Sequence, residues 1–593
     1  NKMKKNFLKY IFIIFAVISF LIFYLSIFGL ETEKFNSQIK NKINQTDKNF
    51  EIELKKIRLT LSPLNFKVNA KTIAPKIFYK KKLIQLEYIE TQISIISLIK
   101  NQIISSKLKL STRSILLKDL VTFFRGITNR PELFILERAV KNGQIIVNLD
   151  LNFDETGKIK DDYKIKAILK DGKIGLLKKY NFEKINFSLN IHNNIFNFKD
   201  LNFTNSKSLF SSKNIKILQN EKDFFIEGQI NNKDLILNEE FLKLFKIDIK
   251  DIGFLNTNFN SNNKFSFSID KKFKLKNLVL NSDIQVNESE YKTSKSLDNY
   301  LEIKDNTIKF KNHKIKSNFK NNKFTINGSG KIKLQEIFED INYSIDSDDK
   351  DFKFNSKLLL SELNFNSQEY LKNFITNLDK TTTLKDQKIE INLDKKKLLI
   401  NGQGKIKFNN DFEDIKFKVL KIKNKFNFNT ELVLDNTPFK INFLNFVKND
   451  KSKTRIRFAG SYEPENSLDF EDISIINENN RLIFKNIFLN KNNLIEKVDE
   501  VKLEFLDNQN KKNNILLKKI KQNKYQITGS SFNAEKLIDS LLVGKKDNNL
   551  KLFQNDIEIS LNLKEIYLDN FYLVNDLNGN LVIENNEIYT ANI

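Results

Sequence analysis

Hydrophobic residues follow two distinct patterns along this chain. The first is a run without charge, residues 10–30, which reads YIFIIFAVISFLIFYLSIFGL. As a helix this run would be about 31 Å long at 1.5 Å per residue, close to the roughly 30 Å hydrocarbon thickness of a bilayer. The run is apolar on every side, which disfavours an amphipathic helix of a soluble protein. It therefore predicts a transmembrane helix.

The charges that flank this run predict its orientation. The residues before it include Lys2, Lys4, Lys5 and Lys9, and Glu31 follows it. Because basic flanks stay in the cytoplasm, we expect a cytoplasmic tail at residues 1–9 and the bulk of the chain across the membrane. A cleaved signal peptide has a shorter apolar core and a small-residue cleavage site, which residues 26–29 (SIFG) do not provide. We therefore expect an uncleaved, single-pass anchor at residues 10–30.

The second pattern is an alternation of apolar and polar residues, which dominates the rest of the chain. Each alternating segment predicts a strand with one apolar and one polar face. Turn-prone pairs such as Asn262-Asn263 and Asn321-Asn322 separate these segments, which is typical of antiparallel strands joined by short turns. The apolar positions that we expect on one face are Ile185, Phe187, Leu189, Phe265, Phe267, Ile269, Ile415, Phe417, Val419, Ile557, Ile559 and Leu561.

Helical periodicity is sparse. Three stripes have apolar residues at helical spacing, within residues 116–124, 371–378 and 537–542, with Ser367 and Asn533 as candidate caps for the second and third. We expect short helices that pack on a sheet as lids or plugs. No Pro/Gly/Ser linker marks a domain boundary. The predicted fold class is mainly β, with one N-terminal transmembrane helix, an elongated antiparallel sheet and a few short helices.

A weak internal repeat supports a meander of similar strands. Residues 326–334 (INGSGKIKL) recur 74 residues later as residues 400–408 (INGQGKIKF). The G-x-G in each copy lacks the third glycine and the following helix of a nucleotide-binding loop. Within a strand, we expect these glycines to mark a bulge or a bend.

Composition and charge add little to this picture. The 593 residues carry a formal net charge of +26 and include no cysteine, so disulfides and thiolate metal sites are excluded. The lysines are spread evenly and often alternate with apolar residues, which does not predict a nucleic-acid interface. His192 and His313 lie far apart, and the acidic run at residues 346–351 lacks the glycine and glutamate of an EF-hand loop. We find no catalytic, cofactor or metal constellation and expect no enzyme activity.

Several segments nevertheless have a sequence pattern that resembles a known family. They are residues 50–57 (FEIELKKI), 59–66 (LTLSPLNF), 134–143 (FILERAVKNG), 145–159 (IIVNLDLNFDETGKI) and 527–542 (ITGSSFNAEKLIDSLL). Together they resemble the AsmA-like superfamily and, within it, the YhdP group with its central domain. On this resemblance, residues 31–130 form an N-terminal AsmA-like β region with a helix, and residues 131–593 form an elongated, repeating β-groove. The chain ends in strand-like sequence, and we expect the natural groove to continue further.

The resemblance implies a location and a function. Such proteins are anchored in the bacterial inner membrane, with the N-terminus cytoplasmic and the bulk periplasmic. Their sheet curls into a groove lined with apolar side chains that carries phospholipid between the inner and outer membranes. The expected partners are phospholipid acyl chains and the inner membrane, with the outer membrane or envelope proteins as candidates at the far end, and not nucleic acid. The twelve alternating apolar residues named above would line the groove.

Two other functions remain open at this point. A sheet that is apolar on one face needs a cover, and a second layer of the protein's own side chains would serve as well as lipid. That arrangement predicts an envelope scaffold or outer-membrane assembly factor with a closed β core. An envelope enzyme, such as a glycan hydrolase, would need carboxylates that converge in a cleft. An apolar face left open along its length would favour transport over both.

Overall fold

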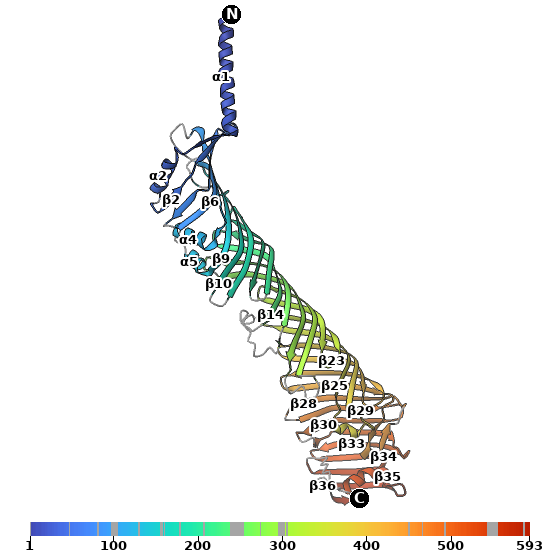
Figure 1. The fold of residues 1–593 in the computed structure, drawn as a ribbon. Helices are drawn as coiled ribbons and strands as arrows, with labels where there is room; N and C mark the ends of the chain where they lie inside the picture. Colours follow the sequence, from blue (N-terminus) through green and yellow to red (C-terminus); the bar gives the residue numbers. More distant parts are fainter. Residues whose placement is uncertain are drawn as a thin grey trace. The chain divides into compact units, whose positions relative to one another are not determined.

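The computed structural model describes most of the chain. It describes residues 2–593 except 47, 80–81, 97–104, 128–130, 155–157, 159, 177–179, 206–207, 238–253, 256, 273, 294–302, 304–305, 449–450, 465–466, 492–493, 543–554 and 585–586. Figure 1 labels its helices and strands from the N-terminus to the C-terminus. The chain divides into two compact units. The first comprises residues 1–236, 258–284 and 318–321, and the second comprises residues 237–257, 285–317 and 322–593.

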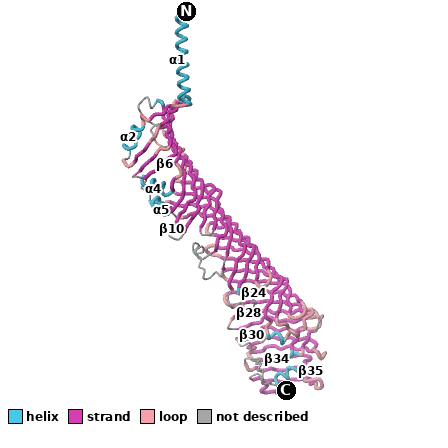
Figure 2. Tube along the Cα trace, viewed as in Figure 1, coloured by secondary structure: helices cyan, strands magenta, loops and turns pink. Residues whose placement is uncertain are grey.

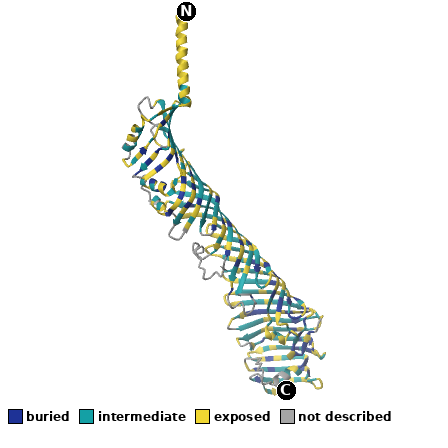
Figure 3. Cartoon of the chain, viewed as in Figure 1, coloured by how far each residue is buried: buried dark blue, intermediate teal, exposed yellow. Residues whose placement is uncertain are grey.

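The apolar N-terminal run forms helix α1 (Lys2–Ile27). Over Met3–Ile27 its mean hydropathy is 2.6, so it is long and apolar enough to cross a membrane, and its side chains are largely exposed (Figure 3). The helix ends three residues before the predicted limit. Gly29 adopts a left-handed conformation (φ 69°) and its N–H, like that of Phe28, donates to the Tyr24 carbonyl. Leu30 is therefore the first residue of a strand and not part of the helix.

Strands make up most of the remaining described chain (Figure 2). The strands of the first unit, with those that continue from it into the second, are β1 (Leu30–Thr32), β2 (Phe50–Glu53), β3 (Ile57–Ser62), β4 (Lys67–Ile73), β5 (Lys76–Tyr79), β6 (Lys82–Ser94), β7 (Ser105–Thr112), β8 (Ile115–Leu116), β9 (Val140–Asn152), β10 (Lys164–Leu176), β11 (Tyr180–His192), β12 (Ile195–Asn205), β13 (Ser208–Gln219), β14 (Asp223–Leu237), β16 (Thr257–Asp270), β17 (Leu275–Lys292) and β18 (Thr307–Lys320). Its helices are α2 (Asn36–Thr46), α4 (Leu117–Ile127), α5 (Pro131–Ala139) and the 3₁₀ turn η1 (Pro63–Asn65).

The second unit is built in the same way. Its strands are β15 (Phe254–Leu255), β19 (Lys323–Lys333), β20 (Phe338–Ser347), β21 (Phe352–Asn366), β22 (Thr381–Asp394), β23 (Lys397–Lys407), β24 (Phe412–Ile422), β25 (Lys425–Leu434), β26 (Phe439–Ile441), β27 (Phe446–Lys448), β28 (Thr454–Glu463), β29 (Ser467–Ile476), β30 (Arg481–Asn490), β31 (Ile495–Lys497), β32 (Glu500–Leu506), β33 (Lys512–Lys521), β34 (Lys524–Asn533), β35 (Ile557–Tyr567), β36 (Leu573–Glu584) and β37 (Glu587–Asn592). Its helical elements are η4 (Glu369–Asn373), η5 (Asn442–Leu444) and α8 (Glu535–Leu542).

Within the described residues, 35 strands belong to one sheet that is not closed into a barrel. Most neighbours in the sequence pair as antiparallel meanders, for example β9 with β10 and β22 with β23. Among the described pairs, β34 and β35 depart from this rule, because they are parallel and the chain between them includes α8. The predicted fold class is confirmed: a mainly β, antiparallel sheet with one apolar N-terminal helix and few other helices.

The sheet continues across the predicted boundary at residues 130 and 131. That boundary falls between α4 and α5, and the strands on either side of it, β7 and β9, pair directly through Leu110 and Leu149. In long stretches, side-chain exposure alternates along each strand (Figure 3). In β24, Lys416 and Lys418 are exposed whereas Ile415, Phe417 and Val419 are half-buried. We call the face that carries the apolar residues the inner face.

The 74-residue repeat is a repeat of four strands. Strands β18–β21 begin at residues 307, 323, 338 and 352; β22, β23 and β24 begin 74 residues after the first three, and β25 begins 73 residues after β21. The interactions repeat as well: Lys331 pairs with Asp340 across β19 and β20, and Lys405 pairs with Asp414 across β23 and β24. The sequence signal covered nine residues of a much longer structural unit.

Candidate functional site

The inner face brings the sequence-predicted residues together within each unit. In the first unit, Leu169 lies opposite Phe187 and Ala167 opposite Leu189. In the second, Ile400 lies opposite Val419 and Tyr525 opposite Ile559. Ile185, Ile557 and Ile559 are buried, and the remaining nine predicted residues are half-buried. The four lysines of the orientation signal lie within the first nine residues, at the start of α1.

Helix α4 covers one side of the inner face in the first unit. Its Leu120 packs with Ile145, Leu169 and Ile185, which are at most 7% exposed. Moving along β9–β11 away from α4, the inner-face residues Leu149, Ile165 and Ile191 become half-buried. The apolar face is therefore sealed at one end of its strands and part-exposed toward the other.

The second unit repeats this arrangement with different lids. Ile375 after η4, the β26–β27 hairpin and α8 pack over one end of the strands, where Phe446 and Leu482 are fully buried. The stripe predicted at residues 371–378 does act as a lid, but as a short 3₁₀ turn. Toward the other strand end the inner face is open to solvent, with Leu393 37% and Tyr462 45% exposed.

A polar band interrupts the inner face in the first unit. The Ser261 hydroxyl donates to the side-chain carbonyl of Asn232, and the Asn263 amide donates to Ser261 and to the Ile230 carbonyl. Strand alternation places Ser261 and Asn263 on the same face as Phe265 and Phe267. The face that the sequence predicts as apolar thus contains buried, internally satisfied polar groups.

A histidine and a tyrosine form a second polar feature, in the second unit. His313 Nε2 lies 3.0 Å from the Lys331 carbonyl and therefore donates to it, which leaves Nδ1 to accept from the Tyr343 hydroxyl at 3.2 Å. Burial lowers the pKa of His313, and burial raises the pKa of Tyr343 to about 12. Both side chains are therefore neutral at pH 7.

The repeated glycines make room for these side chains. A Cβ at Gly330 would lie 2.5 Å from the His313 ring, and one at Gly328 would overlap the Tyr343 ring. In the second copy, Gly402 faces the Phe417 ring and Gly404 faces Gln387. The registers β19–β20 and β23–β24 run without a shift, but the register of β22 with β23 shifts between Lys385 and Lys388, opposite Gly404. The expected bulge is therefore present beside Gly404, on the neighbouring strand. Glycine is needed because a neighbouring side chain lies flat against the strand.

Comparison with family models, curated proteins and solved structures finds no match to this chain.

Two buried glutamates in the repeat were missed by sequence reasoning. Glu413 is 2% exposed and accepts hydrogen bonds from the N–H groups of Asp435, Asn436 and Thr437. Burial alone would raise the pKa of Glu413, but these hydrogen bonds outweigh it and lower the pKa. Its counterpart Glu339 accepts from the N–H and hydroxyl of Ser361. Their 74-residue spacing was the available signal. Glu413 holds the turn beyond β25, whereas Glu339 bonds to Ser361 within β21.

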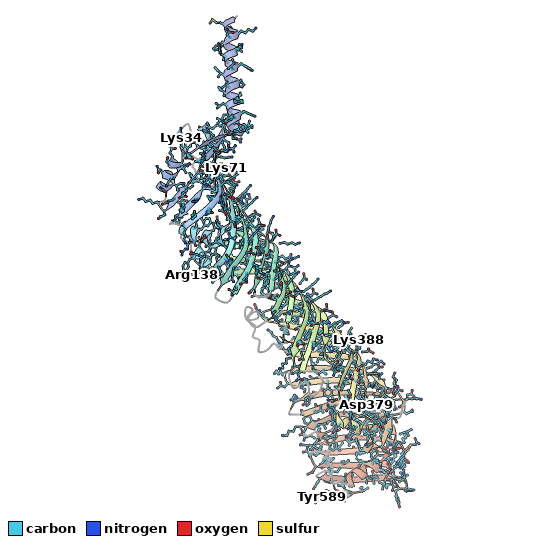
Figure 4. All side chains as sticks on the ribbon, viewed as in Figure 1. Lys34, Lys71, Arg138, Asp379, Lys388 and Tyr589 are labelled. Carbon is cyan, nitrogen blue, oxygen red and sulfur yellow. The ribbon has the colours of Figure 1, made fainter. Side chains whose placement is uncertain are left out.

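The outer face is polar and carries cross-strand ion pairs. Examples are Lys107 with Asp150 at 3.2 Å and Lys524 with Glu558 at 2.6 Å. Lys388, labelled in Figure 4, is another exposed lysine of this face. Such exposed pairs contribute at most about 1 kcal/mol each. The alternating lysines thus form the solvated side of the sheet, as their spacing predicts.

Proposed function

We propose that this chain is a membrane-anchored lipid conduit. In this proposal α1 is a single-pass anchor in the inner membrane, the lysine-rich start is cytoplasmic, and the sheet extends into the periplasm. The inner face carries phospholipid acyl chains between the inner and outer membranes, as the resemblance to the AsmA-like superfamily and the YhdP group implies. The protein acts by binding and guiding lipid, without catalysis.

The observation that carries the proposal is the half-covered inner face. In each unit the protein's own lids bury one end of the strands, and the other end retains rows of part-exposed Phe, Ile and Leu. Contiguous apolar surface of this kind marks a binding site. Each acyl CH₂ group that moves from water onto such a surface contributes about 0.8 kcal/mol. Acyl chains are long and unbranched, which suits a continuous strip better than a closed pocket.

A scaffold with a closed β core is the second candidate, and one observation favours it. Around Phe446, the β26–β27 hairpin and α8 fill the inner face with the protein's own side chains. If a protein partner covered the part-exposed strand ends in the same way, the inner face would be an assembly surface and not a lipid path.

Site-specific photo-crosslinking in cells separates these candidates. A benzophenone amino acid at Phe187 or Phe428, on the inner face, is expected to capture phospholipid, and the same group at the outer-face Lys418 is expected to capture none. Capture of a discrete protein at the inner positions, without lipid, would favour the scaffold. Equal lipid labelling at Phe428 and Lys418 would contradict the conduit.

A further inference from the structure

The strand register shows how the first unit meets the end of α1. Strand β1 pairs with β3 so that Thr32 lies opposite Ile57 and Leu30 opposite Leu59. Because the two strands are antiparallel, successive residues of β3 lie opposite residues of β1 that are progressively nearer to α1. A Cβ at Gly29 would lie 2.8 Å from the Thr60 side chain, so Thr60 is already beside the helix end. Strand β3 then continues for two more residues in that direction.

The joint between helix and sheet contains no linker. Arg58 of β3 donates from Nε to the Phe28 carbonyl at 3.1 Å and from its guanidinium to the Ile27 carbonyl at 3.2 Å. These are carbonyls that the end of a helix leaves without intrahelical partners. Since Gly29 also packs against the Leu59 carbonyl, the helix end is fixed to β3. The end of β3 is therefore held close to the membrane surface when α1 is in a bilayer.

The turn that follows β3 presents apolar side chains to solvent. It is η1, and within it Leu64 is 93% exposed, while Phe66 just after it is 69% exposed. The Phe66 carbonyl accepts from the N–H of Ile95, which places the end of β6 beside this turn, and Ile96 is 60% exposed. Two strand residues and the turn carry Leu64 about 10 Å beyond Thr60. The headgroup layer is about 5–7 Å thick on each side, so this reach extends to the edge of the hydrocarbon.

The same turn occurs elsewhere in the chain with different residues. In η5 the equivalent left-handed position is Asn445 (φ 53°), and the neighbours Leu444 and Phe446 are buried. In η1 that position is Phe66 (φ 50°). Asparagine tolerates a left-handed backbone, whereas a bulky aromatic residue there is uncommon and strained. A phenylalanine at position 66 therefore does not stabilise the fold, and its side chain is exposed to solvent.

We propose that the β3–β4 turn, residues 63–66, inserts into the same bilayer leaflet from which α1 emerges. This inference rests on the proposed anchoring of α1. Leu64 and Phe66 enter the acyl boundary, with Ile96 beside them. The inner face begins at this edge, because Leu61 lies opposite Val68, and Val68 opposite Ile93. Insertion of the turn places the start of the apolar inner face at the hydrocarbon, where an acyl chain can pass onto it without crossing water.

The chain contains no cysteine, so single-cysteine variants of the full chain test the insertion directly. The variants Phe15→Cys, Leu64→Cys and Ser114→Cys carry an environment-sensitive fluorophore in liposomes of phosphatidylethanolamine and phosphatidylglycerol. Lipids with a nitroxide on the acyl chain serve as the quencher. We expect quenching at positions 15 and 64 and none at position 114, which lies beside the opposite end of β6.

The outcomes distinguish the turn from the anchor. Quenching at position 15 without quenching at position 64 overturns the insertion and leaves the anchor intact. No quenching at either position overturns both.

A pair of substitutions separates membrane contact from folding. Phe66→Asn supplies the residue that η5 uses, so the thermal unfolding temperature is expected to stay unchanged or rise. Combined with Leu64→Asp, it is expected to abolish the quenching of a fluorophore at Ile96→Cys. Retained quenching at position 96 in the doubly substituted turn would contradict the proposal.

Discussion

His313 occupies a position in the repeat where the second copy has Gln387, and the two side chains make the same hydrogen bond. Gln387 donates to the Lys405 carbonyl at 2.8 Å, as His313 donates to the Lys331 carbonyl. Only His313 titrates. Burial lowers its pKa from the ordinary value of 6.5, so the folded state resists the proton that the unfolded state accepts.

This difference predicts a pH dependence that one substitution removes. As pH falls below about 6.5 the unfolded chain binds a proton at position 313 before the folded chain does, so stability falls; above that pH this group has no effect. In thermal unfolding scans between pH 7.5 and pH 5.5, His313→Gln is expected to remove this component while keeping the hydrogen bond to Lys331. Gln387→His is the matched reverse variant and should steepen the dependence. An identical pH profile for His313→Gln and the parent would contradict the assignment.

Gly402 gives a second prediction at this scale. A Cβ there would overlap the Phe417 ring, so Gly402→Ala is expected to lower the free energy of unfolding by about 1–3 kcal/mol. Adding Phe417→Leu should recover part of this loss, because the smaller side chain vacates the same space. Denaturant unfolding of the two single variants and the double variant measures the coupling. Strictly additive losses would show that the ring does not lie over the glycine.

Much of the residue scale was open to prediction. The alternation of apolar and polar residues correctly assigned Ile185, Phe417 and Ile559 to the apolar face of their strands, because successive side chains in a strand point to opposite sides. The side chains that lie over the glycines were not open to prediction, since they depend on the exact register of the neighbouring strands. The buried Glu413 was hidden for a similar reason: its partners are backbone N–H groups of a turn, which carry no sequence signature.

The lids decide how much of the inner face remains available. Two of the three helical stripes fold as helices, α4 and α8, and the third gives only the 3₁₀ turn η4. Its apolar spacing is helical, but η4 ends at Asn373 and Ile375 then forms an isolated β-bridge with Phe439. The β26–β27 hairpin escaped notice because each strand is only three residues long. Short elements of this kind carry too few residues to display a period.

The hairpin offers a prediction with its own control. Phe446 is fully buried in the core of the second unit, whereas Phe443 in the same hairpin is 45% exposed. Phe446→Ala is expected to lower the free energy of unfolding by about 3–5 kcal/mol, and Phe443→Ala by less than about 0.5 kcal/mol. Denaturant titration of both variants provides the measurement. Equal effects would mean that the hairpin does not seal the inner face as described.

At the scale of the whole molecule, a conduit is vulnerable at every strand. Under the proposed function each lipid passes each cross-section, so a single carboxylate on the inner face should stop transfer. Phe417→Asp lies on a half-buried, strongly alternating strand, where water can reach the carboxylate without unfolding the sheet. We expect near-normal protein levels with lost lipid transfer between membranes, measured with labelled phospholipid, while Lys418→Asp on the outer face remains active.

Two results would argue against this account of the inner face. A Phe417→Asp protein that is degraded or unfolded would favour a closed core, because burying an unpaired carboxylate in a packed interior is strongly destabilising. A folded and fully active protein would remove Phe417 from the lipid path.

The fold could be predicted at this scale, and the activity could not. A charge-free run and repeated alternation are sufficient for a helix followed by an antiparallel sheet, because both patterns follow from backbone geometry alone. The fold does not specify which ligand binds the inner face, because one sheet architecture can serve several functions. The experiments on Phe187, Phe428 and Phe417 address that remaining question.

The four-strand repeat has a consequence for how such a protein changes length. A copy of 74 residues contains an even number of strands, so the chain enters and leaves it at the same edge with the same direction. Inserting or removing a copy would reverse no strand and exchange no face. Each copy would change the sheet by about 19 Å, at about 4.8 Å per strand. Gene duplication could therefore lengthen or shorten the sheet in fixed steps without changing which of its faces is apolar.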